Sequence, residues 1–100
     1  MEITLKITKE QLKGNVPVTV LHLHGWLDAQ SEELFLATAR DAYDAGARFL
    51  LIDLAEVGTL TSAGMRAIQK VYKLFAAEDE HFKVARVKLC NAPPQVYYVL

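Results

Sequence analysis

A short stretch in the middle of the chain, Phe49 to Leu54, is apolar throughout except for Asp53 near its end. A strand that is apolar on both faces has to be covered on both sides, which is typical of a central strand with parallel neighbours. Parallel neighbours need crossover connections, and these are usually helices. The stretch therefore predicts an α/β fold.

Two segments with helical periodicity flank this strand in the sequence. The first runs from Ser31, a suitable N-cap, to about Ala45, and Gly46 suits its C-terminal stop. The second runs from about Ala63 to Ala77. The apolar stripe of the first helix is Phe35, Ala39, Ala42 and Gly46. That of the second is Met65, Ile68, Val71, Tyr72 and Phe75.

Three further segments are expected to be strands, namely Ile3 to Ile7, Val18 to His24 and Val84 to Leu89. The turn-like stretch Lys13 to Pro17 joins the first two, which should pair antiparallel. Pro93–Pro94 suits the start of a third helix, which the sequence cuts short at Leu100. The expected order is β-β-α-β-α-β-α, a mixed sheet with an opening antiparallel hairpin and right-handed crossovers. Residues 1–100 are expected to form one domain.

The composition is that of an ordinary globular domain, with 52% hydrophobic and 23% charged residues. A formal net charge of −1 argues against non-specific nucleic-acid binding. The longest apolar runs are too short to cross a bilayer, and the start resembles no secretory signal. The lone cysteine, Cys90, cannot form an internal disulfide and is expected to be a buried thiol. A cytoplasmic protein is the resulting prediction.

Three loops should meet at the carboxyl ends of the parallel strands, where such folds bind ligands and partners. They are Gly25 to Asp28, Asp53 to Ser62 and Asn91 to Pro93. Ser62 lies where the N-cap of the second helix belongs, and Gly64 would let another backbone approach closely.

These pieces, in this order and spacing, resemble the STAS domains, which include the bacterial anti-sigma factor antagonists. The matching segments are the strand into Gly25–Trp26–Leu27–Asp28, Phe49 to Leu54, Leu60–Thr61–Ser62–Ala63–Gly64–Met65 and Asn91–Ala92–Pro93. The resemblance covers nearly the whole chain. It implies a protein that acts by binding and is not itself an enzyme.

The resemblance also implies a switch. In the antagonists a serine before a small residue and a glycine, here Ser62, is phosphorylated by a partner kinase that is also the anti-sigma factor. The unphosphorylated form binds this kinase and frees the sigma factor, whereas the phosphorylated form does not bind. Two features depart from the family: Thr61 replaces the usual aspartate and becomes a second candidate acceptor, and the C-terminal helix is truncated, as in a fragment of a longer protein.

The residues expected to bind the partner lie at the loop edge or on the basic face of the second helix. They are Trp26, Asp28, Asp53, Thr61, Ser62, Gly64, Met65, Arg66 and Lys70. Trp26 also has an ordinary interpretation as a loop packing residue, and Asp28 and Asp53 as residues that satisfy loop amides. Arg66, one helical turn after Ser62, is placed to meet a phosphate there. Phosphorylation is therefore expected to change the surface and to leave the fold intact.

The sequence leaves other functions open. The fold also serves as a non-switching scaffold or regulatory subunit in stress-signalling or transporter complexes, and Thr61 keeps this alternative open. Thr61 to Gly64 is half of a nucleophile elbow, with Asp79 and His81 downstream, but Leu60 replaces the first glycine.

Cofactors and metals are not expected. His22 and His24 have ligand-like spacing without an identifiable third ligand, and a solvated sheet face explains them better. The sequence contains no phosphate-binding loop motif. Self-association through a strand edge or through the solvated sheet face stays open.

Overall fold

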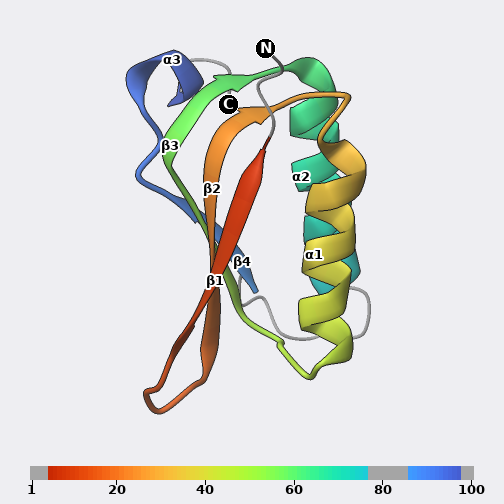
Figure 1. The fold of residues 1–100 in the computed structure, drawn as a ribbon. Coiled ribbons are helices and arrows are strands. Elements are labelled where there is room, and N and C mark those ends of the chain that lie inside the picture. Colours follow the sequence, from red (N-terminus) through yellow and green to blue (C-terminus); the bar gives the residue numbers. More distant parts are fainter. Residues whose placement is uncertain (1–4, 77–85, 98–100) are drawn as a thin grey trace.

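The computed structural model describes residues 5–76 and 86–97. The elements follow in the predicted order (Figure 1). They are β1 (Lys6–Leu12), β2 (Val18–Leu27), α1 (Glu32–Asp44), β3 (Leu50–Leu60), α2 (Ser62–Ala76), β4 (Val87–Cys90) and α3 (Pro94–Tyr97). Within the described ranges, no helix combines the length and the apolar character that crossing a bilayer requires.

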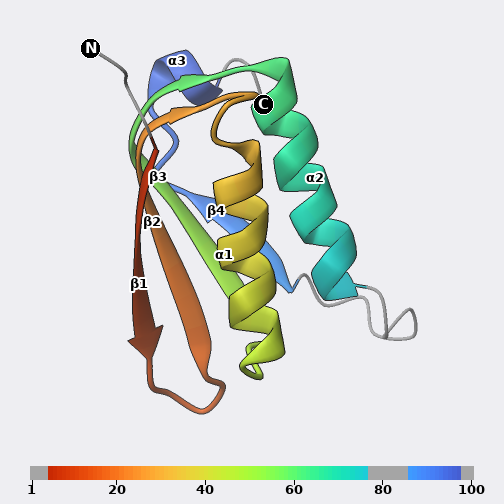
Figure 2. The same ribbon diagram turned by 45° about the vertical axis from the view of Figure 1, so that its right-hand side comes forward.

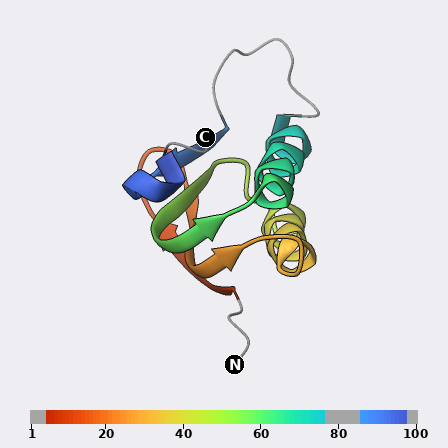
Figure 3. The ribbon, with the colours of Figure 1, turned by 90° about the horizontal axis from the view of Figure 1, so that it is seen from above.

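The strands form one mixed sheet in the order β1-β2-β3-β4. β1 and β2 are antiparallel, whereas β3 runs parallel to both β2 and β4. α1 and α2 pack side by side on one face of the sheet, and α3 lies on the opposite side of β3 (Figures 1, 2 and 3). The mixed α/β fold with its opening hairpin is thus confirmed.

The central position of β3 is confirmed, but its expected cover on both faces is only partly correct. Leu50, Ile52 and Leu54 point toward the helices and are at most 2% exposed. Leu51, on the other face, is only half-buried. The reason is that α1 and α2 both lie on one side of the sheet, while the four-residue α3 contacts β3 from the other.

β3 is longer than predicted, and the expected loop from Asp53 to Ser62 is wrong. The strand continues to Leu60 and pairs with the end of β2, with register shifts between His22 and His24 and again between Gly25 and Trp26. These irregularities allow the polar segment after Asp53 to stay hydrogen-bonded to β2. As a result, only Thr61 separates the end of β3 from the start of α2.

Both long helices bury most of the predicted stripes. α1 buries Phe35, Ala39 and Ala42, and α2 buries Ile68, Val71 and Phe75. Gly46 and Tyr72 were assigned wrongly to these stripes: Tyr72 is 40% exposed, and Gly46 is exposed just past the end of α1.

Gly46 has φ +109° because it closes α1, as its predicted stop role requires. Its N–H donates to the carbonyl oxygen of Tyr43, and the N–H of Ala47 donates to that of Ala42. This pair of hydrogen bonds is the Schellman motif of a helix C-terminus.

The outer strands differ from prediction at their ends. β1 begins at Lys6 and extends to Leu12, beyond the predicted end at Ile7. β4 is assigned from Val87 to Cys90. Ile3, Thr4, Ala77, Asp79, His81, Val84 and Ala85 lie outside the described residues, as does the continuation of α3 beyond Tyr97.

The sheet face away from α1 and α2, on which α3 covers part of β3, is called the open face here. Paired residues share a face, so the register assigns to it Thr8, His22, Asp53 and Cys90 as one row across the four strands. The next row, toward the amino ends of the parallel strands, is Glu10, Val20, Leu51 and Lys88. The following row starts with Leu12 and Val18. The prediction of a partly solvated sheet face is consistent with the exposed Thr8, Glu10 and Lys88.

Candidate functional site

The start of α2 is built around Thr61, and the predicted N-cap role of Ser62 is wrong. The Thr61 Oγ1 accepts a hydrogen bond from the N–H of Gly64 at 3.2 Å, and the Thr61 carbonyl oxygen accepts one from Met65. These are the bonds of an N-cap residue, for which a threonine hydroxyl is well suited. Ser62 therefore occupies the first helical position, and its side chain is exposed.

Gly64 holds this helix start against the end of β2. A Cβ at position 64 would lie 2.3 Å from the carbonyl oxygen of Leu27 and 2.8 Å from a methyl carbon of Leu60. The Leu27 oxygen also accepts a hydrogen bond from the N–H of Thr61 at 3.1 Å. The predicted close backbone approach is confirmed. Gly64 is buried, however, so it lies beneath the predicted partner-binding surface and cannot contact a partner directly.

The loop after β2 lies beside this helix start, because Leu27 joins the two. The Asp28 Oδ1 accepts hydrogen bonds from the N–H groups of Gln30 and Ser31, both at 3.1 Å. The buried Ser31 hydroxyl donates to the carbonyl oxygen of Trp26 at 2.9 Å. Ser31 has the predicted N-cap position of α1, but its side chain makes no capping bond because it is committed to this loop. Asp28 therefore has a structural role here.

Trp26 is the exposed aromatic residue of this region. It ends β2 next to Leu27, is 39% exposed, and its indole lies against Gly58 of β3. An exposed tryptophan beside a polar loop suits an interface anchor.

Positive charge follows Ser62 along α2. Ser62, Arg66 and Lys70 are spaced by four residues, so they share one face of the helix, and all three are exposed. The Lys70 Nζ lies 2.7 Å from the Glu32 Oε2 and so connects α2 to α1. The hydrogen bond from Lys70, together with the charges of Lys70 and Arg66, lowers the pKa of Glu32. Met65, also in the predicted set, is half-buried beside this face.

We call this surface the Ser62 edge. It consists of Trp26, Asp28, Thr61, Ser62, Met65, Arg66 and Lys70.

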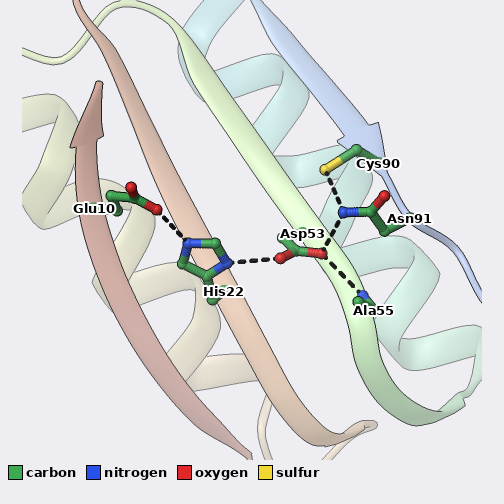
Figure 4. A network of polar contacts seen from close by, with 6 residues as sticks. All are labelled: Glu10, His22, Asp53, Ala55, Cys90 and Asn91. Carbon is green, nitrogen blue, oxygen red and sulfur yellow. Dashed lines mark hydrogen bonds and ion pairs between the residues drawn. The ribbon is translucent and has the colours of Figure 1, made fainter. Parts of the chain in front are cut away.

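Asp53 does not belong to the Ser62 edge, contrary to prediction. It lies on the open face, seven residues before the end of β3, which at about 3.3 Å per residue is roughly 20 Å away. The Asp53 Oδ2 lies 2.6 Å from the His22 Nδ1, and its Oδ1 accepts hydrogen bonds from the N–H of Ala55 and the side chain of Asn91 (Figure 4). The extension of β3 beyond Asp53 accounts for the wrong placement.

His22 is the centre of a polar network that crosses the sheet. Its Nε2 lies 2.8 Å from the Glu10 Oε1 on β1, while its Nδ1 faces Asp53 on β3 (Figure 4). Two carboxylates can both accept hydrogen bonds from the ring only when both nitrogens carry protons. Hydrogen bonds to Glu10 and then to Asp53 accordingly raise the pKa of His22.

The same network sets the ionisation of its neighbours. Burial acts to raise the pKa of Asp53, but hydrogen bonds from Ala55, Asn91 and His22 outweigh it and lower that pKa. Burial, and then the charge of Asp53, raise the pKa of Cys90. Cys90 is half-buried, less than predicted, and is a neutral thiol, not a reactive thiolate.

The network leaves His22 without a free lone pair for a metal ion. In the described part of the chain, no three His, Cys, Asp or Glu side chains are grouped to hold a metal. Glu10 was not predicted from the sequence, and Asn91 was predicted only as part of a loop. The signal available was the pairing of β1 with β2, which places Glu10 on the same face as His22.

Comparison with known proteins identifies the family. The STAS domain model matches residues 7–100. The anti-sigma factor antagonist SpoIIAA in its unphosphorylated form has 17% identity over 93% of this chain and 81% of its own, with a TM-score of 0.66. The Bacillus cell fate determinant SpoIIAA in its phosphorylated form has 17% identity over 92% of this chain and 79% of its own, with a TM-score of 0.62.

A third similar structure is an anti-sigma factor antagonist from Mycobacterium paratuberculosis. It has 19% identity over 84% of this chain and 66% of its own, with a TM-score of 0.61. No curated protein matches the chain. At these identities the solved structures support the fold, and the domain model supports the family. The chain belongs to the STAS domain family.

Proposed function

We propose that this chain is a phospho-regulated protein-binding switch of the anti-sigma factor antagonist type. In its unphosphorylated form it binds an anti-sigma factor that is also a serine kinase, and so releases a sigma factor in the bacterial cytoplasm. It acts by binding and not by catalysis. The observation that carries the proposal is the exposed Ser62 at the first position of α2, at the sheet edge where such folds meet partners.

The two candidate acceptors differ in their availability. The Thr61 hydroxyl is half-buried and holds the helix N-cap bond with Gly64. The Ser62 hydroxyl is exposed and bonds to no other described residue. A kinase can therefore phosphorylate the Ser62 hydroxyl without breaking a hydrogen bond of the described structure. This difference favours Ser62 over Thr61 as the acceptor.

A phosphate on Ser62 suits the local electrostatics. The first-turn N–H groups of α2 and the positive end of its dipole favour an anion, and Arg66 follows one turn later. The modified chain should keep its fold. The altered property is the surface, because a dianion resists the desolvation that docking requires. A hundredfold loss of affinity corresponds to about 2.7 kcal/mol, which one misplaced dianion can supply.

The second candidate function is a scaffold or regulatory subunit in a stress-signalling or transporter complex, without a phosphorylation switch. The observation in its favour is Thr61, which replaces the family's usual aspartate and forms the N-cap. In this case the Ser62 edge would bind its partner constitutively.

Phosphate transfer from the cognate kinase and ATP separates the two functions. The chain contains two serines, and Ser31 is only 6% exposed, so phosphoserine in the folded protein reports Ser62. The switch predicts phosphoserine that disappears in Ser62→Ala and persists in Thr61→Val, which has no hydroxyl at position 61. Phosphothreonine that disappears in Thr61→Val would move the acceptor to Thr61. Absence of any incorporation would favour the scaffold.

A further inference from the structure

The open face carries a charge pattern that the register of the sheet defines. Glu10 pairs with Val20, Val20 pairs with Leu51, and Leu51 pairs with Lys88. Residues directly paired across strands lie on the same face, so this row reads acid, apolar, apolar, base from β1 to β4. When two copies of such a row face each other in opposite directions, the acid of each copy lies opposite the base of the other.

An apolar hollow of about 390 Å³ adjoins this row on the open face. Leu12 and Val16 at its border are 43% and 48% exposed, and Leu51 is half-buried in it. Arg86, whose guanidinium lies 5.6 Å from the centre of the Phe49 ring, and Lys88 add positive charge at its other side. Exposed apolar side chains with charge at their rim are typical of a protein contact surface.

We propose that the half of the open face at the amino ends of the parallel strands, away from α3, binds a second copy of this chain, in a symmetric dimer whose two-fold axis runs parallel to the strands. Rotation about that axis places β1 of one copy opposite β4 of the other. The row Glu10, Val20, Leu51, Lys88 then meets its own reverse. Each dimer gains two contacts between Glu10 and Lys88, with the apolar hollows of the two copies beside them.

Glu10 and Lys88 can each form a further ion pair with a second copy. Lys88 is exposed and has no ion-pair partner among residues 5–76 and 86–97. Glu10 is 53% exposed, and only its Oε1 faces His22, so Oε2 can accept a further hydrogen bond. The charge pattern favours a second copy over an unrelated protein, because an unrelated partner would not require a self-complementary row.

A face contact fits better than edge-to-edge pairing of strands. The edge strand β1 carries Lys6 and Lys9, and the edge strand β4 has four residues in the described chain. Lysines and short length are features by which proteins discourage edge pairing. The open face also lies opposite α1 and α2, so a dimer would leave the Ser62 face of α2 accessible on both copies (Figures 1 and 3).

Sedimentation velocity on the full chain and its charge variants tests the dimer. The wild-type chain should self-associate reversibly. Glu10→Lys and Lys88→Glu should each weaken self-association about tenfold or more, because each homodimer then contains two like-charge contacts. An equimolar mixture of the two variants should restore it as a heterodimer. Lys9→Glu, which changes a charge on the other face of the same strand, is the matched control and should have no effect.

A zero-length carbodiimide cross-link provides a second measurement that needs no variant. Glu10 and Lys88 lie on the two outer strands, three strand spacings or roughly 14 Å apart within one copy. A cross-linked Glu10–Lys88 peptide should therefore occur in the dimer band and be absent from the monomer band. A chain that stays monomeric at millimolar concentration, a mixture that associates no better than its components, or a dimer band without this peptide would each overturn the proposal. None of these outcomes depends on phosphorylation.

Discussion

Gly64 of α2 lies in contact with the backbone of Leu27, so closely that a Cβ at position 64 would stand 2.3 Å from the Leu27 carbonyl oxygen. The contact fixes the first turn of α2, and with it the exposed Ser62, against the carboxyl end of β2. No flexible side chain can move aside to relieve such an overlap, because the obstructing atom belongs to the backbone.

Gly64→Ala should therefore destabilise the protein although alanine favours helix. Overpacking of this kind costs about 1–3 kcal/mol, and we expect the upper part of that range. Urea denaturation measures the loss. The matched control is Gly14→Ala, where the added methyl would meet only the Val16 carbonyl oxygen at 4.0 Å, so stability should change little. Equal stability of Gly64→Ala and wild type would show that the helix start can move away from β2.

Thr61 should be required as a cap and not as a phosphoacceptor. Thr61→Val keeps the shape of the side chain but removes the oxygen that accepts the Gly64 N–H bond, which should cost about 1 kcal/mol of unfolding free energy. Thr61→Ser keeps an oxygen at this position and should be nearly neutral. If both variants unfold at the same urea concentration as wild type, the assignment of Thr61 as N-cap is wrong.

The His22 network should make stability depend on pH in a defined direction. The pKa of His22 is raised from its usual 6.5, so its contribution is complete below 6.5 and is lost as pH rises through the higher folded-state value. The pKa of Asp53 is lowered from 3.8, so its contribution is complete above 3.8 and is lost as pH falls through the lower value. The stability difference between wild type and His22→Gln should thus be largest between these two limits.

Urea midpoints across pH for the two proteins test this dependence. The difference should shrink as the solution becomes alkaline, because deprotonation leaves one carboxylate without a donor on the ring. His24→Gln is the control, since within the described part of the chain the bonds to Glu10 and Asp53 come from His22 and stay intact in this variant. A difference that grows with rising pH would mean that His22 is neutral in the folded protein.

The order of the elements could be predicted because the apolar run at Phe49 to Leu54 and the stripes of the two helices are strong periodic signals. The extension of β3 to Leu60 could not, because Glu56, Gly58 and Thr59 read as loop residues. Their strand conformation depends on pairing with the irregular end of β2, which is a tertiary effect.

The candidate site was predicted only in part, and the errors have related causes. Neighbouring hydroxyl residues at 61 and 62 both suit an N-cap, and the choice between them depends on where β3 ends. Asp53 was placed at the wrong edge by the same error in strand length. Glu10 and Asn91 join the His22 network only through strand pairing and through the positive φ of Asn91, neither of which periodicity reveals.

The dissociation constant between the cognate kinase and this chain, determined for the unmodified protein and for the protein phosphorylated on Ser62, tests the switch most directly. The phosphorylated chain should bind about a hundredfold more weakly, or about 2.7 kcal/mol, while its amide spectrum changes only near the start of α2. Equal affinity of the two forms, or a loss of affinity accompanied by collapse of the amide spectrum, would contradict a switch that acts through surface charge alone.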